Sequence, residues 1–224
     1  MIQIEKTEVY GWEAAIRGMR NPMNSWDKSD SIKCGFGDLF IGRNDAELMM
    51  RLTKAGDDHG KVARYLDVYV DITAPFYFWK EFRTYRKGRK FMDDGDELLD
   101  PNDLEMHIET NSCSTMHKIH TKEFTLDDFS TDHLDDFSID HLKTFILYLN
   151  SMRDMFLETK NKHYWWQIIQ LLPSSYNQKR TVKLNYQVLK NMYHARKNHK
   201  LDEWRVLCEW IEQLPYSELI TGNE

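Results

Sequence analysis

The segment from Leu66 to Ile72 constrains the fold of this chain more than any other part of the sequence. Every second residue is Leu, Val or Ile, with Asp or Tyr between them, which is the period-2 pattern of a half-buried β-strand. Ile2 and Ile4 alternate with polar residues and predict a short edge strand. The second half instead predicts helices, over residues 139–158, 163–172, 181–196 and 201–213. Few strands and many helices predict an α+β domain.

Three further helices are expected in the first half of the chain. Residues 12–16 predict a short helix, and Asn44 is expected to cap a second one over about residues 45–55. A third helix is expected to start near Pro75 and to run to Gly88. It carries an aromatic stripe at helical spacing, and such a stripe usually belongs to the core.

The length of 224 residues favours a single domain over residues 1–224. The longest apolar runs fall far short of the roughly 20 residues that a membrane-spanning helix needs. The first residues lack the basic start and apolar run of a secretory signal, so we expect a cytoplasmic protein. Three unevenly spaced cysteines predict neither a disulfide framework nor a zinc site, and we expect reduced thiols.

The charge is unevenly distributed along the sequence. The formal net charge of -6 disfavours nucleic acid as a general partner. Residues 93–140 carry 15 Asp and Glu against two lysines, and residues 92–109 alone carry eight acids and no Lys or Arg. That shorter run predicts an exposed acidic insertion. Residues 153–200 carry ten Lys and Arg against two acids, which suits either a phosphate-bearing ligand or a solvated face.

An octapeptide is duplicated within the acidic stretch, where residues 127–134 and 135–142 match at seven of eight positions. Its Asp and Ser side chains suit turns and helix starts, so the repeat predicts two successive helix starts. The repeat also contains Asp and His, and His117 and His120 lie just before it. These residues do not recur at a spacing that closes a known metal site, so no metal is predicted.

The order of the larger pieces resembles one family, although no P-loop, dinucleotide fingerprint or nucleophile elbow is present. A helix ends in Ala-Gly, a loop with His59 follows, then come a strand, a helix and an Asn-x-x-Ser element at residues 111–114. Near the C-terminus stand Asn185, Leu189, Arg196, Glu203 and Arg205. This arrangement resembles the flavin-dependent, or alternative, thymidylate synthases.

Spacing gives a physical reason for part of that pattern. Asn185, Leu189 and Arg196 lie 4 and 11 residues apart, so on one helix they would share a face. An amide and a guanidinium beside an apolar contact could form a wall for a ring with an attached phosphate. The alternative is an amphipathic helix whose arginine reaches solvent.

The signature of the family, RHRxxSxNExSxR, is present in degraded form. Its RHR falls on residues 82–84, where only the central base Arg83 remains, with Arg86 nearby. Its second half falls on residues 111–116, where Asn111 and Ser114 remain, while Ser112 and Met116 replace Glu and Arg. The acidic insertion separates the two halves.

The resemblance implies a thymidylate synthase-complementing-protein-like fold, mostly helical with a small antiparallel sheet. It implies a homotetramer that binds FAD and converts dUMP to dTMP, using methylenetetrahydrofolate and NADPH. Arg205 would be the catalytic residue that holds and polarises the pyrimidine. Substrate contacts would come from Ser114, Arg196 and Arg205, and cofactor contacts from His59, Arg83, Arg86, Asn111 and Asn185.

Two other functions remain open at this point. The lost arginines of the signature weaken phosphate binding, which favours a catalytically degenerate nucleotide-binding or regulatory protein on the same fold. Such a protein could be encoded by a bacterium or its phage. The acidic insertion could instead serve as a docking surface in an interaction protein.

Overall fold

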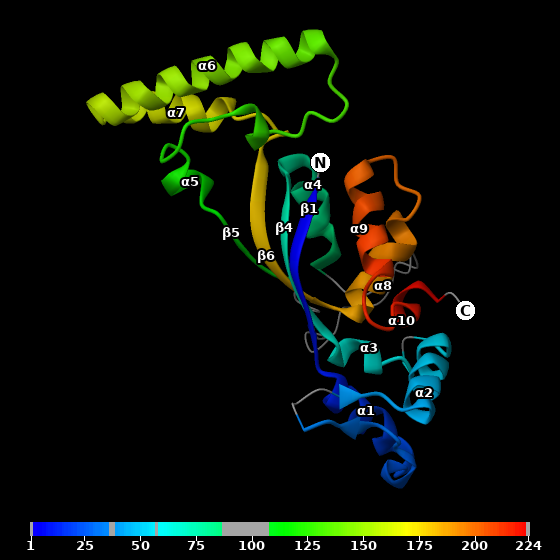
Figure 1. Ribbon diagram of the computed structural model, residues 1–224. Helices are drawn as coiled ribbons and strands as arrows, with labels where there is room; N and C mark the ends of the chain where they lie inside the picture. Colours follow the sequence, from blue (N-terminus) through cyan, green and yellow to red (C-terminus); the bar gives the residue numbers. More distant parts are fainter. Residues whose placement is uncertain (1, 36–38, 57, 87–107, 223–224) are drawn as a thin grey trace, which may run out of the picture. The chain divides into compact units, whose positions relative to one another are not determined.

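A computed structural model describes residues 2–35, 39–56, 58–86 and 108–222 (Figure 1). The chain forms two compact units. Unit 1 contains Met1–Gln3, Asp71–Arg83 and Thr110–Thr181, and unit 2 contains Ile4–Val70, Thr84–Glu109 and Val182–Glu224. The α+β class and the predominance of helices are confirmed. No helix in these described stretches is both long enough and apolar enough to span a bilayer.

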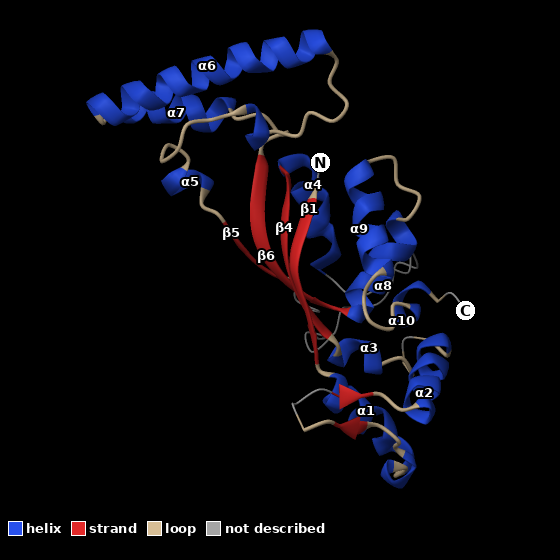
Figure 2. Cartoon of the chain, viewed as in Figure 1, coloured by secondary structure: helices blue, strands red, loops and turns tan. Residues whose placement is uncertain are grey.

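Four strands form the main sheet in the order β1 (Gln3–Tyr10), β4 (Asp67–Pro75), β6 (Asn177–Asn185) and β5 (Glu109–Ser112) (Figure 2). The alternating segment is β4, whose inward Val and Ile side chains are buried. The predicted N-terminal edge strand is β1, which lies at the edge of this sheet. A second, two-stranded antiparallel sheet pairs β2 (Ile32–Lys33) with β3 (Leu39–Phe40).

The prediction of a helix over residues 181–196 is wrong for its first five residues. Residues 181–185 belong to β6, and the helix, α8 (Tyr186–Arg196), begins only after Asn185. In β6 the buried positions alternate through Gln178, Arg180, Val182 and Leu184. Two of these four inward side chains are polar, so the strand lacks the apolar alternation by which sequence reasoning recognises one.

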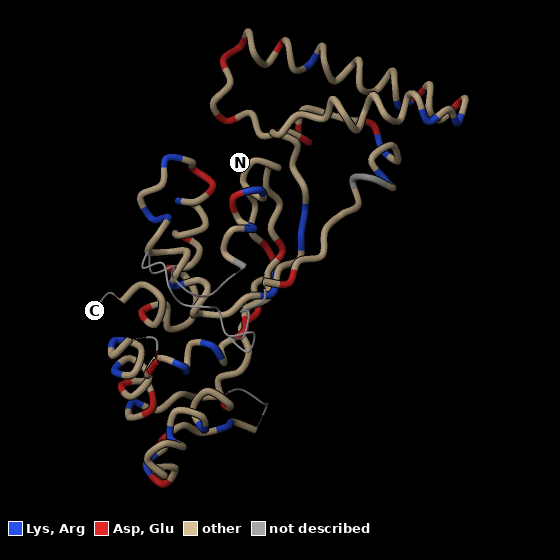
Figure 3. Tube along the Cα trace, turned by 180° about the vertical axis from the view of Figure 1, so that it is seen from behind, with Lys and Arg blue, Asp and Glu red and all other residues tan. Residues whose placement is uncertain are grey.

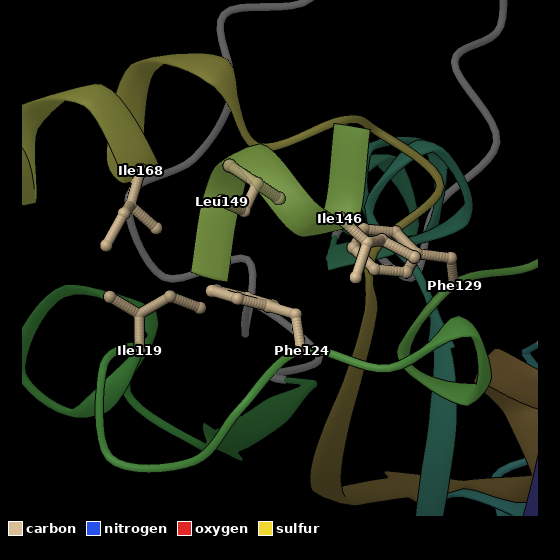
Figure 4. Close-up of a cluster of buried hydrophobic side chains, with 6 residues drawn as sticks. All are labelled: Ile119, Phe124, Phe129, Ile146, Leu149 and Ile168. Atoms are coloured by element: carbon tan, nitrogen blue, oxygen red, sulfur yellow. The ribbon is translucent and has the colours of Figure 1, made fainter. Parts of the chain in front are cut away.

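In unit 1, α6 (Asp136–Thr159) packs against α7 (Lys162–Leu171). Between them and the preceding segment lies an apolar cluster, which is drawn in Figure 4 and consists of Ile119, Phe124, Phe129, Ile146, Leu149 and Ile168. The amide of Asn150 accepts a hydrogen bond from the Phe124 backbone N–H at 2.8 Å and donates one to its carbonyl at 2.9 Å. This pairing fixes the segment to α6. The remaining helices of unit 1 are short: α4 (Phe76–Phe82), α5 (Thr115–Lys118) and the 3-10 turn η4 (Leu126–Asp128).

The duplicated octapeptide starts one helix and not two. In the second copy, Asp135 caps α6 by accepting a hydrogen bond from the Ser138 backbone N–H at 2.7 Å. In the first copy, the carboxylate of Asp128 instead accepts a hydrogen bond from the backbone N–H of Thr125. Thr125 and Asp128 thereby form a capping box around the short turn η4, which ends at Asp128. Phe129 then forms an isolated bridge with Tyr176. The same sequence thus adopts two conformations: the first copy bridges to Tyr176, and the second copy begins α6.

Unit 2 packs its helices around apolar faces of α8 and α9 (Asp202–Glu212), both largely buried. Its other helices are α1 (Trp12–Arg20), the 3-10 turns η1 (Asn21–Met23) and η2 (Trp26–Lys28), α2 (Arg43–Lys54), α3 (Val62–Tyr65) and α10 (Glu218–Thr221).

The predicted cap of α2 is wrong, because Asn44 lies inside the helix. The carboxylate of Asp30 takes that role, accepting hydrogen bonds from the N–H groups of Asn44 and Asp45 at 2.9 and 3.2 Å.

Candidate functional site

A pocket of about 400 Å³ in unit 1 is the candidate site. It lies where α4, β5 and β6 meet, together with the first residue of the 3-10 turn η3 (Arg83–Arg86). The lining side chains are aromatic, cationic or uncharged polar, and none is a carboxylate: Phe76, Trp79, Lys80, Arg83, Ser112, Gln178 and Arg180. Its volume is within the usual range for small-molecule sites.

The wall from α4 is held by a buried indole. Trp79 is almost fully buried, and its Nε1 donates a hydrogen bond to the backbone oxygen of Gln178 at 2.9 Å. Phe78 and Phe82 pack on the same indole with ring centroids 5.5 and 5.3 Å away. With this face of α4 buried, Lys80 and Arg83 remain exposed at the pocket.

The wall from β6 carries a preoriented arginine. Arg180 is only 6% exposed, and its guanidinium carbon lies 4.3 Å from the ring centroid of Trp79. Its Nε donates to the side-chain oxygen of Gln178 at 3.0 Å, and Gln178 in turn donates to the carbonyl of Cys113 at 2.7 Å. A cation stacked on an aromatic face and hydrogen-bonded at Nε has little freedom left to lose on binding a ligand.

The electrostatics of the pocket favour an anion. Three cations from three elements line it, and guanidinium groups bind phosphate with paired hydrogen bonds. Phe76 and Trp79 add an apolar wall beside these charges. A phosphate ester attached to a planar ring matches this combination of charged and aromatic surfaces.

Three of the residues expected from the sequence lie in or next to this pocket. Arg83 lines it directly. Asn111 is exposed in β5, one residue before the lining Ser112. Ser114 follows and caps α5, its hydroxyl accepting a hydrogen bond from the His117 backbone N–H at 3.0 Å. Arg83 and Ser112, which lie 29 positions apart in the sequence, thus line the same pocket.

The expected Arg196 lies in unit 2, at the end of α8. Its Nε donates to the hydroxyl of Tyr85 at 2.6 Å, and its guanidinium carbon lies 5.5 Å from the Tyr85 ring centroid and 5.0 Å from that of Trp204. On the same helix Leu189 is fully buried. Asn185 caps α8 by accepting a hydrogen bond from the Val188 N–H at 3.0 Å. The arginine therefore connects η3 to α8 and α9.

The other expected residues also belong to unit 2. Arg205 pairs with Asp202 one turn earlier on α9 and donates to the carbonyl of His199 at 2.9 Å. His59 is exposed between α2 and α3, where its N–H donates to the Gly56 carbonyl at 3.2 Å. Arg86 ends η3. Unit 2 thus holds five of the expected residues: His59, Arg86, Asn185, Arg196 and Arg205.

Sequence reasoning missed the residues that build most of the pocket, in particular Trp79, Gln178 and Arg180. A signal for two of them was present. Gln178 and Arg180 occupy alternate positions ahead of Val182 and Leu184, so a strand prediction for this segment would have placed both on the buried face. The helix prediction concealed that register.

Comparison with known proteins identifies the fold. No family model and no curated protein matches the sequence. The solved structures that match include two crystal structures: the flavin-dependent thymidylate synthase ThyX of Helicobacter pylori complexed with FAD and dUMP, and the same enzyme with these ligands at 2.31 Å resolution. The first has a TM-score of 0.63 and 16% identity over 98% of both chains. The second has a TM-score of 0.64 and 16% identity over 99% of this chain and 98% of the other. The fold expected from the sequence, that of the flavin-dependent thymidylate synthases, is therefore confirmed.

Proposed function

We propose that this protein binds FAD and dUMP and acts as a flavin-dependent thymidylate synthase. The observation that carries the proposal is a cationic and aromatic pocket without carboxylates, on a fold that matches FAD- and dUMP-bound ThyX over its whole length. We further propose methylenetetrahydrofolate and NADPH as co-substrates and a homotetramer as the working assembly.

The residues of the pocket fit the phosphate end of such ligands. Arg180 and Arg83 would bind phosphate oxygens, Lys80 would add a third positive charge, and the hydroxyl of Ser112 would donate a hydrogen bond. When bound, FAD would supply the hydride chemistry that reduces the transferred one-carbon group. In unit 2, Arg205 would hold and polarise the pyrimidine. Arg196 would fix the position of η3 through its contacts with Tyr85 and Trp204.

A second candidate is a nucleotide-binding protein without flavin chemistry. It is favoured by the replacement of signature positions with side chains that cannot bind phosphate through charge. Phe82 is almost fully buried in the core of unit 1, and Thr84 carries no charge. Such a protein would keep the pocket and lose the cofactor.

Two measurements separate these candidates. The first is an absorbance spectrum of the purified protein, in which a bound oxidised flavin gives the yellow bands of FAD. The second is thermal unfolding with FAD or dUMP, because a ligand at 100 times its Kd stabilises by about 2.7 kcal/mol. A synthase is expected to respond to both ligands and to form dTMP, whereas the degenerate protein responds only to the nucleotide.

Substitutions of pocket residues test whether dUMP binds in the pocket. We expect Lys80→Gln and Arg180→Gln each to weaken dUMP binding by roughly tenfold, since each removes a charge-assisted contact. Lys80 is exposed, so its loss leaves the fold intact. Arg43→Gln is the matched control, because Arg43 is an exposed base of unit 2. Unchanged binding in both pocket variants, or no stabilisation by either ligand, would refute the proposal.

A further inference from the structure

We propose that a second pocket, in unit 2, binds the phosphate group of a small anionic ligand. Its volume is about 390 Å³, close to that of the candidate pocket in unit 1. It lies where α1, η2 and α2 meet, and its lining combines bases with an acid, an amide and a leucine: Arg20, Lys28, Arg51, Glu47, Asn44 and Leu48. All of these residues belong to unit 2, so this pocket is separate from the one proposed to bind dUMP.

A buried guanidinium provides a fixed donor to this pocket. Arg20 is only 4% exposed, and its Nε donates to Asp45 at 2.6 Å while its Nη1 donates to the carbonyl of Ser25 at 3.1 Å. Within the described chain its Nη2 has no hydrogen-bond partner. This nitrogen is not sealed in the core, because the fully buried polar side-chain atom without a partner in the described residues belongs to His120. A ligand that accepts a hydrogen bond from Nη2 therefore meets a donor whose position is already fixed.

Two bases at the pocket have no acidic partner. Neither Lys28 nor Arg51 forms an ion pair with a residue that the structure describes. Figure 3 shows both acidic and basic positions along α2. The acid of the lining, Glu47, is paired with Arg43, whose Nε lies 2.7 Å from its carboxylate. The positive charge of Lys28 and Arg51 is therefore available to an anion, which breaks no ion pair when it binds.

The arrangement of the lining suits a phosphate carried on a small molecule. Lys28 lies in η2 and Arg51 in α2, so two separate elements can contribute charge-assisted hydrogen bonds to one phosphate group. The amide of Asn44 offers both a donor and an acceptor, and Leu48 offers an apolar contact. The volume of about 390 Å³ is within the usual range for small-molecule sites.

An exposed tryptophan beside this pocket can report on binding. Trp26 belongs to η2, two residues before Lys28, and its Nε1 donates to the side chain of Asn21 at 2.8 Å. Trp26 is 54% exposed, so Trp26→Phe can assign its resonance in the full chain labelled with 5-fluorotryptophan. We expect inorganic phosphate, titrated at constant ionic strength, to shift the fluorine-19 resonance of Trp26 until the site is saturated.

Substitutions of the lining bases test whether phosphate binds in this pocket. We expect Lys28→Gln and Arg51→Gln each to weaken phosphate binding by roughly threefold to tenfold, and the double variant to abolish the shift. Lys61→Gln is the matched control, because Lys61 is an exposed base of unit 2 outside the lining. Lys80→Gln, in the pocket of unit 1, should also leave this titration unchanged. No saturable shift in the wild type, or a wild-type shift in the double variant, would overturn the proposal.

A second probe distinguishes the two sources of a phosphate group. If the ligand is a phosphate monoester, phenyl phosphate should bind roughly threefold to tenfold more tightly than inorganic phosphate, through an added apolar contact with Leu48. Equal affinities would identify free phosphate as the ligand. Binding of either probe with wild-type affinity to the Lys28→Gln/Arg51→Gln variant would place it elsewhere and exclude this pocket.

Discussion

Asp45 is a fully buried carboxylate in unit 2 that depends on a small polar network. It accepts hydrogen bonds from Arg20 Nε at 2.6 Å, from the Ser29 hydroxyl at 2.7 Å and from the Ser31 hydroxyl at 2.6 Å. Burial raises the pKa of Asp45, but the hydrogen bonds from the two serines and Arg20, with the charge of Arg20, outweigh it and leave the pKa below its ordinary value. The charged form is therefore the one that stabilises the fold.

We expect Asp45→Asn to lower the free energy of unfolding by about 3 kcal/mol at pH 7, because it leaves Arg20 buried without its ion-pair partner. A carboxylate with a lowered folded-state pKa contributes stability above its ordinary pKa and loses it on acidification. The difference between wild type and variant should therefore shrink as the pH falls below 3.8, the ordinary pKa of Asp. Urea unfolding between pH 7 and pH 2.5 measures it.

The control for this prediction is a pair of the same chemistry at the surface. Arg43 and Glu47 form an i,i+4 ion pair at 2.7 Å with both side chains mostly exposed. We expect Glu47→Gln to change stability by less than about 0.5 kcal/mol. A cost for Asp45→Asn as small as this would mean that the buried network contributes nothing beyond packing.

At the scale of elements, the junction between β1 and α1 depends on a glycine. Gly11 has φ of +98°, in the left-handed region, and a Cβ built there would lie 1.9 Å from the carbonyl oxygen of Tyr65. Both the backbone conformation and the close approach exclude a side chain. Gly56, after α2, has φ of +101° and open space around it. Gly35 has neither restriction.

Replacing each of these three glycines with alanine should destabilise the protein to a different extent. Gly11→Ala should cost the most, above about 2 kcal/mol, because the clash adds to backbone strain. Gly56→Ala should cost about 1 kcal/mol from the backbone conformation alone. Gly35→Ala should be neutral or slightly stabilising. Chemical unfolding of the three variants measures the order, and an equal cost at Gly11 and Gly56 would show that β1 and α1 relax away from Tyr65.

The duplicated octapeptide provides a matched pair of phenylalanines. Phe129, in the first copy, is 3% exposed and belongs to the apolar cluster of unit 1. Phe137, at the same place in the second copy, belongs to α6 and is 73% exposed. Phe129→Ala should lower the free energy of unfolding by about 3–5 kcal/mol. Phe137→Ala should leave the stability of the single chain nearly unchanged, and equal effects would mean that the two copies exchange places.

Several elements could be predicted from local sequence, and others could not. The strand β4 and the helix α9 carry their own local signals, so both elements were predicted from the sequence. The N-cap of α2 could not be, because Asp30 lies outside the helix and reaches it only through the fold. The two copies of the octapeptide differ in conformation because of Tyr176, which is distant in sequence. Local sequence patterns predict that a helix or strand exists. They do not predict the contacts with residues distant in sequence that determine where it begins and ends.

At the scale of the whole molecule, the candidate pocket combines segments that are distant in sequence. The resemblance to a family pattern pointed to Arg83 and to the Asn111–Ser114 element, and Arg83 and Ser112 both line the pocket. Arg180 was missed because its place in the pocket depends on the pairing of β6 with β5 and on the contact with the indole of Trp79. Spacing along one segment cannot show such contacts between segments. The uneven charge, in contrast, is fully visible in the sequence.

That charge leads to a prediction about anion binding. The chain has a formal net charge of -6, whereas the pocket is cationic. The net charge repels a phosphate ligand at long range, and the pocket attracts it at short range. Replacing the seven acids between residues 93 and 105 with Asn or Gln changes the net charge from -6 to +1. At low ionic strength we expect this variant to bind dUMP roughly threefold to tenfold more tightly.

Salt and an uncharged ligand test whether the field causes this gain. At about 1 M salt the Debye length falls to about 3 Å, so the effect of distant charges should vanish and the two proteins should bind dUMP equally. Deoxyuridine, which lacks the phosphate, should bind both proteins equally at any salt concentration. Titration calorimetry of both proteins with both ligands at two ionic strengths measures these affinities. If the gain survives high salt or extends to deoxyuridine, the acidic segment acts through direct contact with the site and not through its charge.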